Sequence, residues 1–412
     1  MLKIYNVHVR IFAAACLISA ASTRRCTLLQ CADLQRCAAN GFTFFLYPGQ
    51  DDDTTGCEWN NTASGYDNHK FYMACLRSVI RSQMVTVTDP SRACLLVPSI
   101  DTTCAFNMCR PNISNDLADL PGWNDGRNHV ILHTPNDAAT PAYDVGQAML
   151  ISSSSTARTF RPGFDAIMPL YIGTMLKYAT TEAARIYRHR TILAFFSGCI
   201  YPPRYDAGSE ARTATRRMLM QALSKHPSVV VSGTCCHWGH SEGRPYCENC
   251  GRNITDCSDT SAMPMREGHL TAKFVLCPEG AGPLSYRILE AMAAGAVPVV
   301  VSRDGVLPGA GTSLHHIWEE CVVLWPAHSV QVLAELPIYL TSIHGARWER
   351  KRRACQRLIA GGFMDFPSAV KETLCSIGSL LRKQLPSLSL RGCNTSHWHR
   401  QPYLNMLPGQ VQ

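Results

Sequence analysis

The chain alternates short, mainly apolar runs with longer polar stretches that have helical spacing. In the first half, the apolar runs occupy residues 41–47, 93–98 and 128–133, and residues 66–82 have helix-like spacing. Apolar runs of this length, bounded by polar loops, are typical of buried strands in a parallel sheet. The alternation predicts an α/β domain over residues 38–185.

The same alternation returns in the second half of the chain. Apolar runs at 191–196 and 229–232 flank a helix predicted from about residue 209 to about residue 224. We predict a second α/β domain over residues 190–345, followed by closing helices within residues 346–385. This pattern favours two Rossmann-like domains that face each other across a cleft.

The segment 274–302 predicts a strand, a glycine-rich loop, a helix and a second strand. Residues 274–277 and 297–301 are apolar runs, residues 278–282 hold the loop, and Pro283 stands where a first helical turn tolerates proline. Such a βαβ crossover aims the helix N-terminus at the crevice beyond the strand ends, where phosphates bind.

Two charged residues of this helix are candidates for binding a nucleotide sugar. Arg287 and Glu290 are three positions apart, so they share one helical face. A guanidinium near a diphosphate and a carboxylate that accepts from ribose hydroxyls are what such a site needs. The alternative is an ordinary surface pair on the helix, which the pattern alone leaves open.

Composition describes a folded protein with a modest positive charge. Of the 412 residues, 46% are hydrophobic and 17% are charged, and the formal net charge is +8. The densest basic run, residues 347–353, is interpreted as a solvated helix face, so no nucleic-acid partner is predicted. The positive balance suits an anionic sugar donor or acceptor.

The first 22 residues have the pattern of a signal peptide. Lys3 and Arg10 precede an apolar run at 11–21, with small residues Ser19 and Ala21 at its end. The run is about half of the ~20 residues that a membrane-spanning helix needs, so a cleaved signal is favoured over a short retained anchor.

Cysteines and glycosylation sequons also indicate the secretory pathway. The chain has 20 cysteines and four Asn-X-Ser/Thr sequons, at Asn60, Asn112, Asn253 and Asn394. In an oxidising lumen we expect the cysteine clusters at 26–37, 94–109 and 235–257 to form local disulfides.

Two metal-binding patterns are weighed against simpler interpretations. Cys235 to His240, with Cys247, Cys250 and Cys257, has residue types and spacing that could hold zinc, but an oxidising compartment favours disulfides. Asp51–Asp53 could suggest the Asp-x-Asp metal site of a GT-A enzyme, but the following residues favour a solvated turn. No metal site is predicted.

Several segments resemble, in the same order, the motifs of one enzyme family. Cys37–Pro48 resembles the family's opening strand, Thr88–Pro98 its "DPxxAxLFxxP" segment and Trp123–His129 its "W-N-x-G-x-N-H" signature, and Asp144–Leu150 and Phe160–Asp165 match further segments. The family is the exostosin-type glycosyltransferases, and the likeness is to the N-terminal exostosin domain of heparan sulfate polymerase subunits.

The resemblance implies a fold, a location and a reaction. These are a GT-B fold, the lumen of the Golgi or endoplasmic reticulum, and inverting transfer of a sugar from a UDP-sugar to a glycan acceptor. Glucuronic acid is the sugar associated with this domain in the polymerase subunits. No cofactor is implied, and another exostosin-type subunit is a candidate partner in an oligomer.

The resemblance also assigns site residues. Arg287 and Glu290 match the Arg and Glu of the family's "S-F-R-F-L-E-A" helix and would contact the uridine diphosphate, with Ser285 in the same motif. Arg212 resembles the Arg of the "G-S-x-x-R" segment and is a second candidate for the diphosphate. Its alternative role is a solvent-facing residue that opens a helix.

The chain departs from the family at three loops. An arginine-rich loop is replaced by Glu279–Gly282, a Lys-Gly-Lys by Ser197–Cys199, and a Trp-Glu loop by Arg303–Gly309, in which Asp304 favours a turn. Each lost charged hydrogen bond weakens donor binding by about 1.5 to 3 kcal/mol. The departures therefore support a second hypothesis, a non-catalytic subunit that stabilises an active partner.

The general base of an inverting transferase is expected in the N-terminal domain. His129, Asp144 and Asp165 are candidates by position alone, and His129 has an alternative role as a buried structural histidine. The sequence assigns none of them as the catalytic residue.

Overall fold

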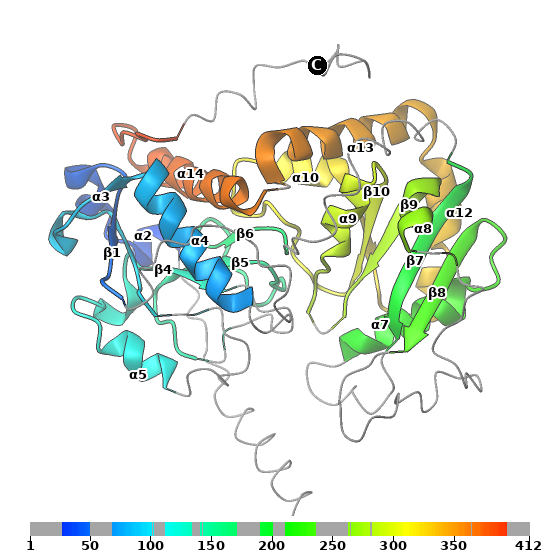
Figure 1. The fold of residues 1–412 in the computed structure, drawn as a ribbon, viewed down its shortest axis with the longest axis horizontal. Helices are drawn as coiled ribbons and strands as arrows, with labels where there is room; N and C mark the ends of the chain where they lie inside the picture. The colour runs from blue at the N-terminus through cyan, green and yellow to red at the C-terminus, as the bar shows by residue number, and fades with distance from the viewer. Residues whose placement is uncertain are drawn as a thin grey trace, which may run out of the picture. The chain divides into compact units, whose positions relative to one another are not determined.

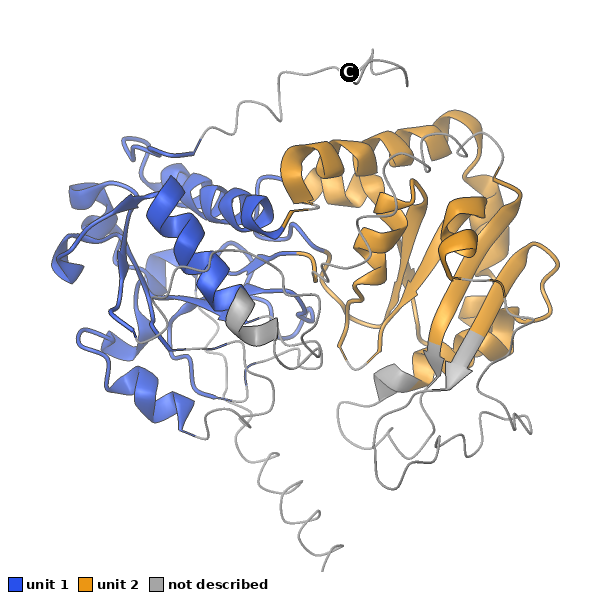
Figure 2. Ribbon diagram, viewed as in Figure 1, with its two compact units in different colours: residues 1–168, 308–314, 366–395 blue, residues 169–307, 315–365, 396–412 orange. Residues whose placement is uncertain are grey.

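The computed structural model describes residues 27–49, 68–100, 102, 112–133, 141, 143–170, 190–200, 211–235, 263, 265–280, 282–363 and 365–393. The chain divides into two compact units, which Figure 2 colours separately. Unit 1 comprises residues 1–168, 308–314 and 366–395, and unit 2 comprises residues 169–307, 315–365 and 396–412.

Several sequence predictions fall outside the described residues. These are the signal segment, Asp51–Asp53, the sequons at Asn60, Asn253 and Asn394, and the Cys/His cluster beyond Cys235. The fourth sequon residue, Asn112, is exposed at the start of a helix. In the described part of the chain, no helix has both the length and the apolar character needed to cross a membrane.

Unit 1 is built on parallel strands flanked by helices (Figure 1). Its elements are α2 (Leu28–Cys31), α3 (Leu34–Asn40), β1 (Thr43–Leu46), α4 (Asn68–Gln83), β2 (Val85–Thr86), η1 (Pro90–Arg92), β3 (Leu95–Val97), α5 (Ile113–Ala118), η3 (Asn124–Gly126), β4 (Val130–His133), β5 (Met149–Ser152), β6 (Ala166–Ile167) and α14 (Phe366–Gln384). The strand orders are β2-β1-β3 and β4-β5-β6, and a bridge from Leu96 to His129 links the two sheets.

Unit 2 has one five-stranded parallel sheet with helices around it (Figure 1). Its elements are β7 (Ile192–Ile200), α7 (Ala211–Leu223), β8 (Val229–Cys235), α8 (Met265–Thr271), β9 (Ala272–Pro278), α9 (Arg287–Ala293), β10 (Val297–Ser302), α10 (His315–Cys321), β11 (Val323–Pro326), α11 (Val330–Ala334), α12 (Leu336–Ser342), α13 (Gly345–Leu358) and the π-helix η7 (Ile359–Phe363). The strand order is β11-β10-β9-β7-β8.

The predicted α/β architecture with two parallel-sheet units is confirmed. All the strand pairings that the structure describes are parallel, and apolar strand residues such as Phe274, Leu276 and Val299 form the centre of the unit 2 core. The closing helices belong to different units, because α13 lies in unit 2 and α14 in unit 1. Phe366 of α14 packs edge-on against Tyr72 of α4.

Helix α9 begins later than the sequence predicted. Pro283 lies in a bend, and the first helical residue is Arg287. The hydroxyl of Ser285 accepts the backbone N–H of Arg287 at 3.4 Å, which is the role of a residue that precedes a helix. The helix therefore has only seven residues, and its first side chain is the predicted ligand Arg287.

A short segment that follows β10 in sequence completes an edge of the unit 1 sheet. The N–H of Gly309 donates to the carbonyl of Ile167 at 2.7 Å, and the N–H of Ile167 donates to Ala310 at 2.9 Å. Gly311 has a φ of +73°, and a Cβ there would overlap the carbonyl oxygen of Asp165. Only glycine fits this close approach of two backbones.

The described disulfides differ from the local pairings that we expected. Cys37 pairs with Cys94, across 57 residues, and so joins two of the clusters instead of closing one. The reason is topological: Cys37 shortly precedes β1 and Cys94 immediately precedes β3, and these strands are neighbours. Two further bridges, Cys321–Cys355 and Cys375–Cys393, were not foreseen.

Removing the Cys37–Cys94 bridge should destabilise unit 1. We expect the double variant C37A/C94A to lose about 2 to 4 kcal/mol of unfolding free energy, because the cross-link restricts a long loop of the unfolded chain. Urea denaturation of the purified protein measures this loss. C277A is the control, since Cys277 is a buried free thiol, and it should lose only about 1 kcal/mol. Equal losses in the two variants would contradict a stabilising cross-link.

Candidate functional site

The strand order of unit 2 predicts a ligand-binding crevice between β7 and β9. In an open α/β sheet, ligands bind beyond the carboxyl ends of the strands where the strand order reverses, here between the first and third strands of the unit. Strand β7 pairs with β9 only as far as Phe195 and Val275, although β7 continues to Ile200. The carbonyl of Ser197 lies beyond the last of these pairs.

Arg287 fills the position where β7 and β9 separate. Its Nε donates to the carbonyl of Ser197 at 3.0 Å, and its guanidinium lies 5.5 Å from the ring centroid of Phe196. The side chain is buried, with 4% of the residue exposed. A Cβ at Gly198 would overlap Nη2 of Arg287, so the glycine makes room for the guanidinium.

Glu290, one helical turn later, is buried without a partner. The residue is 6% exposed, and neither carboxylate oxygen has a hydrogen-bond partner in the described part of the chain. Burial raises the pKa of Glu290 to about 7, and the Arg287 guanidinium partly opposes that shift. An ordinary surface pair is therefore excluded, because both residues of the pair are buried.

Of the other two predicted ligands, Ser285 is described with its side chain, whereas Arg212 is described by its backbone alone. Ser285 is buried, and its hydroxyl accepts from Nη1 of Arg287 at 3.4 Å, so it helps to orient that side chain. The backbone of Arg212 lies in the first turn of α7, and its side chain is outside the described atoms. Thr215, three positions later in α7, contacts the loop that follows β9.

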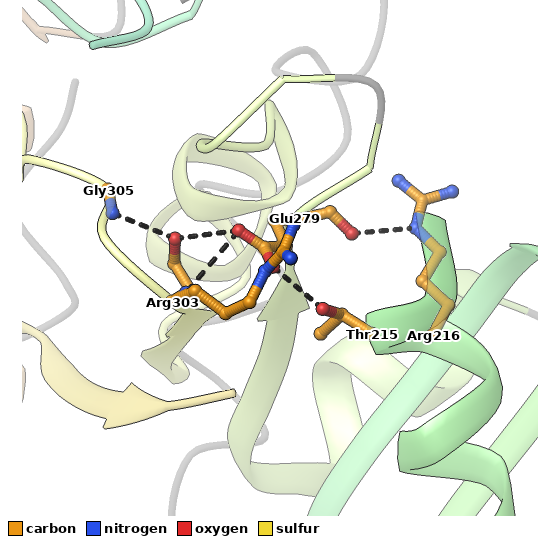
Figure 3. Close-up of polar contacts among 6 residues, drawn as sticks. Thr215, Arg216, Glu279, Arg303 and Gly305 are labelled. Atoms are coloured by element: carbon orange, nitrogen blue, oxygen red, sulfur yellow. Dashed lines mark hydrogen bonds and ion pairs between the residues drawn. The ribbon is translucent and has the colours of Figure 1, made fainter. Parts of the chain in front are cut away.

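The carboxylate of Glu279 is wholly enclosed, and Figure 3 shows its contacts with Thr215 and Arg303. Oε1 accepts from the hydroxyl of Thr215 at 2.7 Å and from Nε of Arg303 at 2.8 Å, and Oε2 accepts from the hydroxyl of Ser302 at 3.0 Å. Glu279 is 0% exposed. Arg303 forms an ion pair with this carboxylate, which therefore links the ends of β9 and β10 inside the protein.

Sequence reasoning did not foresee these partners of Glu279, although a signal was available. Glu279 follows β9 directly and Arg303 follows β10 directly, and these are adjacent parallel strands. Residues at the carboxyl ends of neighbouring parallel strands meet at one edge of the sheet. An Arg and a Glu at these positions are therefore expected to pair.

His129, a candidate base in unit 1, has a structural environment. Its Nε2 lies 3.0 Å from the hydroxyl of Tyr47, and its Nδ1 lies 3.0 Å from the carbonyl of Arg127. The rings of Tyr47 and Trp123 pack against it, and the residue is 0% exposed. Burial lowers the pKa of His129 to about 4. These contacts favour the buried structural role.

The two aspartate candidates are also engaged locally. The Arg161 side chain donates two hydrogen bonds to the carboxylate of Asp165, at 2.8 Å from Nε and at 2.6 Å from Nη2. Both residues are buried. Asp144 is exposed, and its Oδ1 accepts the N–H of Gly146 at 2.9 Å, which stabilises a turn. Neither carboxylate has the environment of an activated base.

The "W-N-x-G-x-N-H" segment forms a tight turn before β4. Three of its non-glycine residues have positive φ, namely Asn124 at 43°, Asp125 at 54° and Asn128 at 61°. The buried side chain of Asn128 donates to the carbonyl of Cys94 at 2.9 Å and accepts the N–H of Asp33 at 2.6 Å. This motif of the resemblance thus has a structural role, because Asn128 joins three segments of unit 1.

Comparison with known proteins agrees with the motifs. The family model of the exostosin GT47 domain matches residues 28–340, which is most of the chain. This chain belongs to the exostosin GT47 family. The matched range contains both the structural turn of unit 1 and the Arg287–Glu290 site of unit 2.

The exostosin chain is similar to curated relatives over most of its own length. It is 27% identical to Exostosin-1 of Bos taurus over 400 residues, covering 92% of this chain and 48% of that protein. It is 27% identical to Exostosin-1a of Danio rerio over 371 residues, covering 85% and 45%. The chain thus spans about half the length of the curated relatives it matches.

Among solved structures, the exostosin chain is similar to sucrose-phosphate synthase from Thermosynechococcus elongatus. The sequence identity is 13%, the TM-score is 0.29, and the match covers 78% of this chain and 67% of that one. The α/β fold is shown by the strands and pairings of the chain itself.

Proposed function

We propose that this exostosin chain is a glycosyltransferase that moves a sugar from a UDP-sugar donor to a glycan acceptor in the secretory pathway, with inversion at the transferred carbon. Glucuronic acid is the first candidate for the sugar. The observation that carries the proposal is the buried, unpartnered carboxylate of Glu290, one helical turn from the guanidinium of Arg287.

A buried carboxylate without hydrogen bonds is costly, so its presence requires an explanation. Native proteins satisfy most buried polar groups, and an unsatisfied one often marks a site where a ligand supplies the missing partner. The hydroxyls of a ribose are donors of the right kind for the oxygens of Glu290. Arg287 supplies the positive charge that a diphosphate needs nearby.

The proposed chemistry assigns a role to Arg287 of unit 2. The leaving diphosphate carries the charge that develops during transfer, and preorganised cations such as Arg287 stabilise it. The acceptor hydroxyl needs a general base. His129, Asp144 and Asp165 have structural contacts instead, so the base is left unassigned.

The disulfide bonds of the chain support the proposed secretory location. Disulfides form and persist in oxidising compartments, and bridges such as Cys37–Cys94 need such a compartment to form. We propose the lumen of the Golgi or endoplasmic reticulum as the place of action, with the N-terminal segment as signal or anchor. Another exostosin-type subunit is the proposed partner in an oligomer.

Nucleotide titration tests the proposal directly. We expect calorimetry to show UDP and UDP-glucuronic acid binding to the purified chain, and R287A to weaken UDP binding about 10- to 100-fold by removing a charged hydrogen-bond donor. R353A, which removes an exposed arginine of α13, is the control and should bind like the wild type. Equal binding by R287A and the wild type would place the nucleotide elsewhere.

The alternative function is a non-catalytic subunit that stabilises an active glycosyltransferase. The observation that favours it is the loop at Glu279–Gly282, which holds no arginine and has its one carboxylate enclosed. A folded wild-type chain that binds neither UDP nor UDP-glucuronic acid would favour this alternative, and its partner would then be sought by co-purification.

A further inference from the structure

We propose that Arg303 contacts the diphosphate of the donor, in place of the missing loop arginines, and that Glu279 is the positioning residue that holds Arg303 there. The inference rests on the proposed function and adds a second diphosphate-binding residue, beside Arg287, to the same site. Figure 3 shows the contacts between these two residues and their neighbours.

The Arg303 guanidinium is anchored at one end and available at the other. Nε donates to Oε1 of Glu279 at 2.8 Å, and the backbone N–H faces Oε2 at 3.4 Å. The side chain is 28% exposed, and within the described part of the chain its two Nη atoms make no hydrogen bond. Arginine presents its Nη donors as a rigid fork that matches phosphate oxygens.

The loop that carries Arg303 is fixed against the loop that precedes α9. The hydroxyl of Ser302 donates to Glu279 and accepts the N–H of Gly305 at 3.0 Å (Figure 3). A Cβ at Gly305 would lie 2.8 Å from the carbonyl of Pro283 and 2.7 Å from Oγ of Ser302. Arg303 is therefore held beside the segment that leads directly to Arg287.

Glu279 does not cancel the positive charge of this region. Arg216 donates through Nε to the backbone carbonyl of Glu279 at 3.3 Å, so three guanidinium groups, of Arg216, Arg287 and Arg303, surround the β9–α9 loop and its helix. These guanidinium groups make the region suitable for an anionic diphosphate.

Glu279 also explains how the loop tolerates the loss of its arginines. A positioning residue must itself be rigid, and Glu279 is fully buried with four donors from Thr215, Ser302 and Arg303 around it. Three separate elements, α7, β9 and the end of β10, are tied to this one carboxylate. Arg303 is thus preorganised for binding, which lowers the entropy lost when a ligand is held.

The test compares UDP with uridine, because only UDP carries phosphates. We expect R303A to weaken UDP binding about 10- to 100-fold and to leave uridine binding, followed by NMR at millimolar concentrations, within about twofold of the wild type. R303K should behave like R303A toward UDP, since lysine keeps the ion pair with Glu279 but lacks the fork. R353A on α13 is the matched control and should change neither affinity.

The outcomes separate this inference from the proposed function. If the wild type binds UDP and R303A binds it equally well, or loses UDP and uridine alike, Arg303 does not contact the diphosphate although the nucleotide site stands. If the folded wild type binds no UDP, the proposed function fails and this inference fails with it. E279Q, compared at equal folded fraction by circular dichroism, should lose UDP affinity and keep uridine affinity if Glu279 positions Arg303.

Discussion

Replacing Asp165 by asparagine should lower the unfolding free energy of unit 1 by about 3 to 5 kcal/mol, a large loss for a single substitution. The carboxylate accepts four hydrogen bonds, two from the Arg161 side chain and two from the N–H groups of Leu150 and Arg161. Burial raises the pKa of Asp165, and the Arg161 guanidinium and these N–H groups oppose that shift. Asparagine would leave the buried guanidinium without a counter-charge.

D165N should also destabilise the sheet edge next to Arg161 and Asp165. Leu150 lies in β5, and the backbone of Asp165 packs against Gly311 in the segment that completes the edge. Urea denaturation followed by circular dichroism measures the effect. D144N is the control, since Asp144 is exposed and asparagine can keep its bond to Gly146, so it should stay within about 0.5 kcal/mol of the wild type. A loss below about 1 kcal/mol in D165N would contradict the anchoring role.

The fold was predictable where apolar runs are long and bounded by turns. The runs at 274–277 and 297–301 became β9 and β10, because each could only be buried on both faces of a parallel sheet. Strands β2 and β6 have two residues each, so no periodicity could reveal them. Their place is set by tertiary pairing, as with Ile167 and the residues around Gly309.

The sequence motif named the candidate site residues, but it did not show what surrounds their side chains. The motif located Arg287 and Glu290, but the environment of Arg287 depends on Ser197 and Gly198, about ninety positions earlier in the chain, which only the β7–β9 adjacency brings near. The unforeseen role of Glu279 has the same origin. The hydroxyl and guanidinium partners of its carboxylate come from α7 and the end of β10.

Replacing Glu290 by glutamine should stabilise the protein at pH 8 and weaken nucleotide binding. The folded-state pKa is raised from 4.5 to about 7, so the neutral form is favoured by the fold. Stability from this group is fully present below the unfolded pKa of 4.5 and is lost as pH rises through 7. Glutamine stays neutral, so E290Q should gain up to about 3 kcal/mol at pH 8 and much less at pH 5, measured by urea denaturation.

Nucleotide affinity should move in the opposite direction and depend on pH. The ionised carboxylate is the stronger acceptor for ribose hydroxyls, so UDP binding by the wild type should strengthen as pH rises through 7, whereas E290Q should bind weakly with no such step. E349Q is the matched control, and its UDP affinity should equal that of the wild type. Hydrogen bonds from Arg352 lower the pKa of Glu349 on α13, so the stability that Glu349 contributes is lost as pH falls. A variant that is both more stable and a poorer binder is what a carboxylate retained for its ligand predicts, because a purely structural carboxylate would lose stability when neutralised. Wild-type affinity that stays the same between pH 5.5 and 8 would remove Glu290 from the nucleotide site.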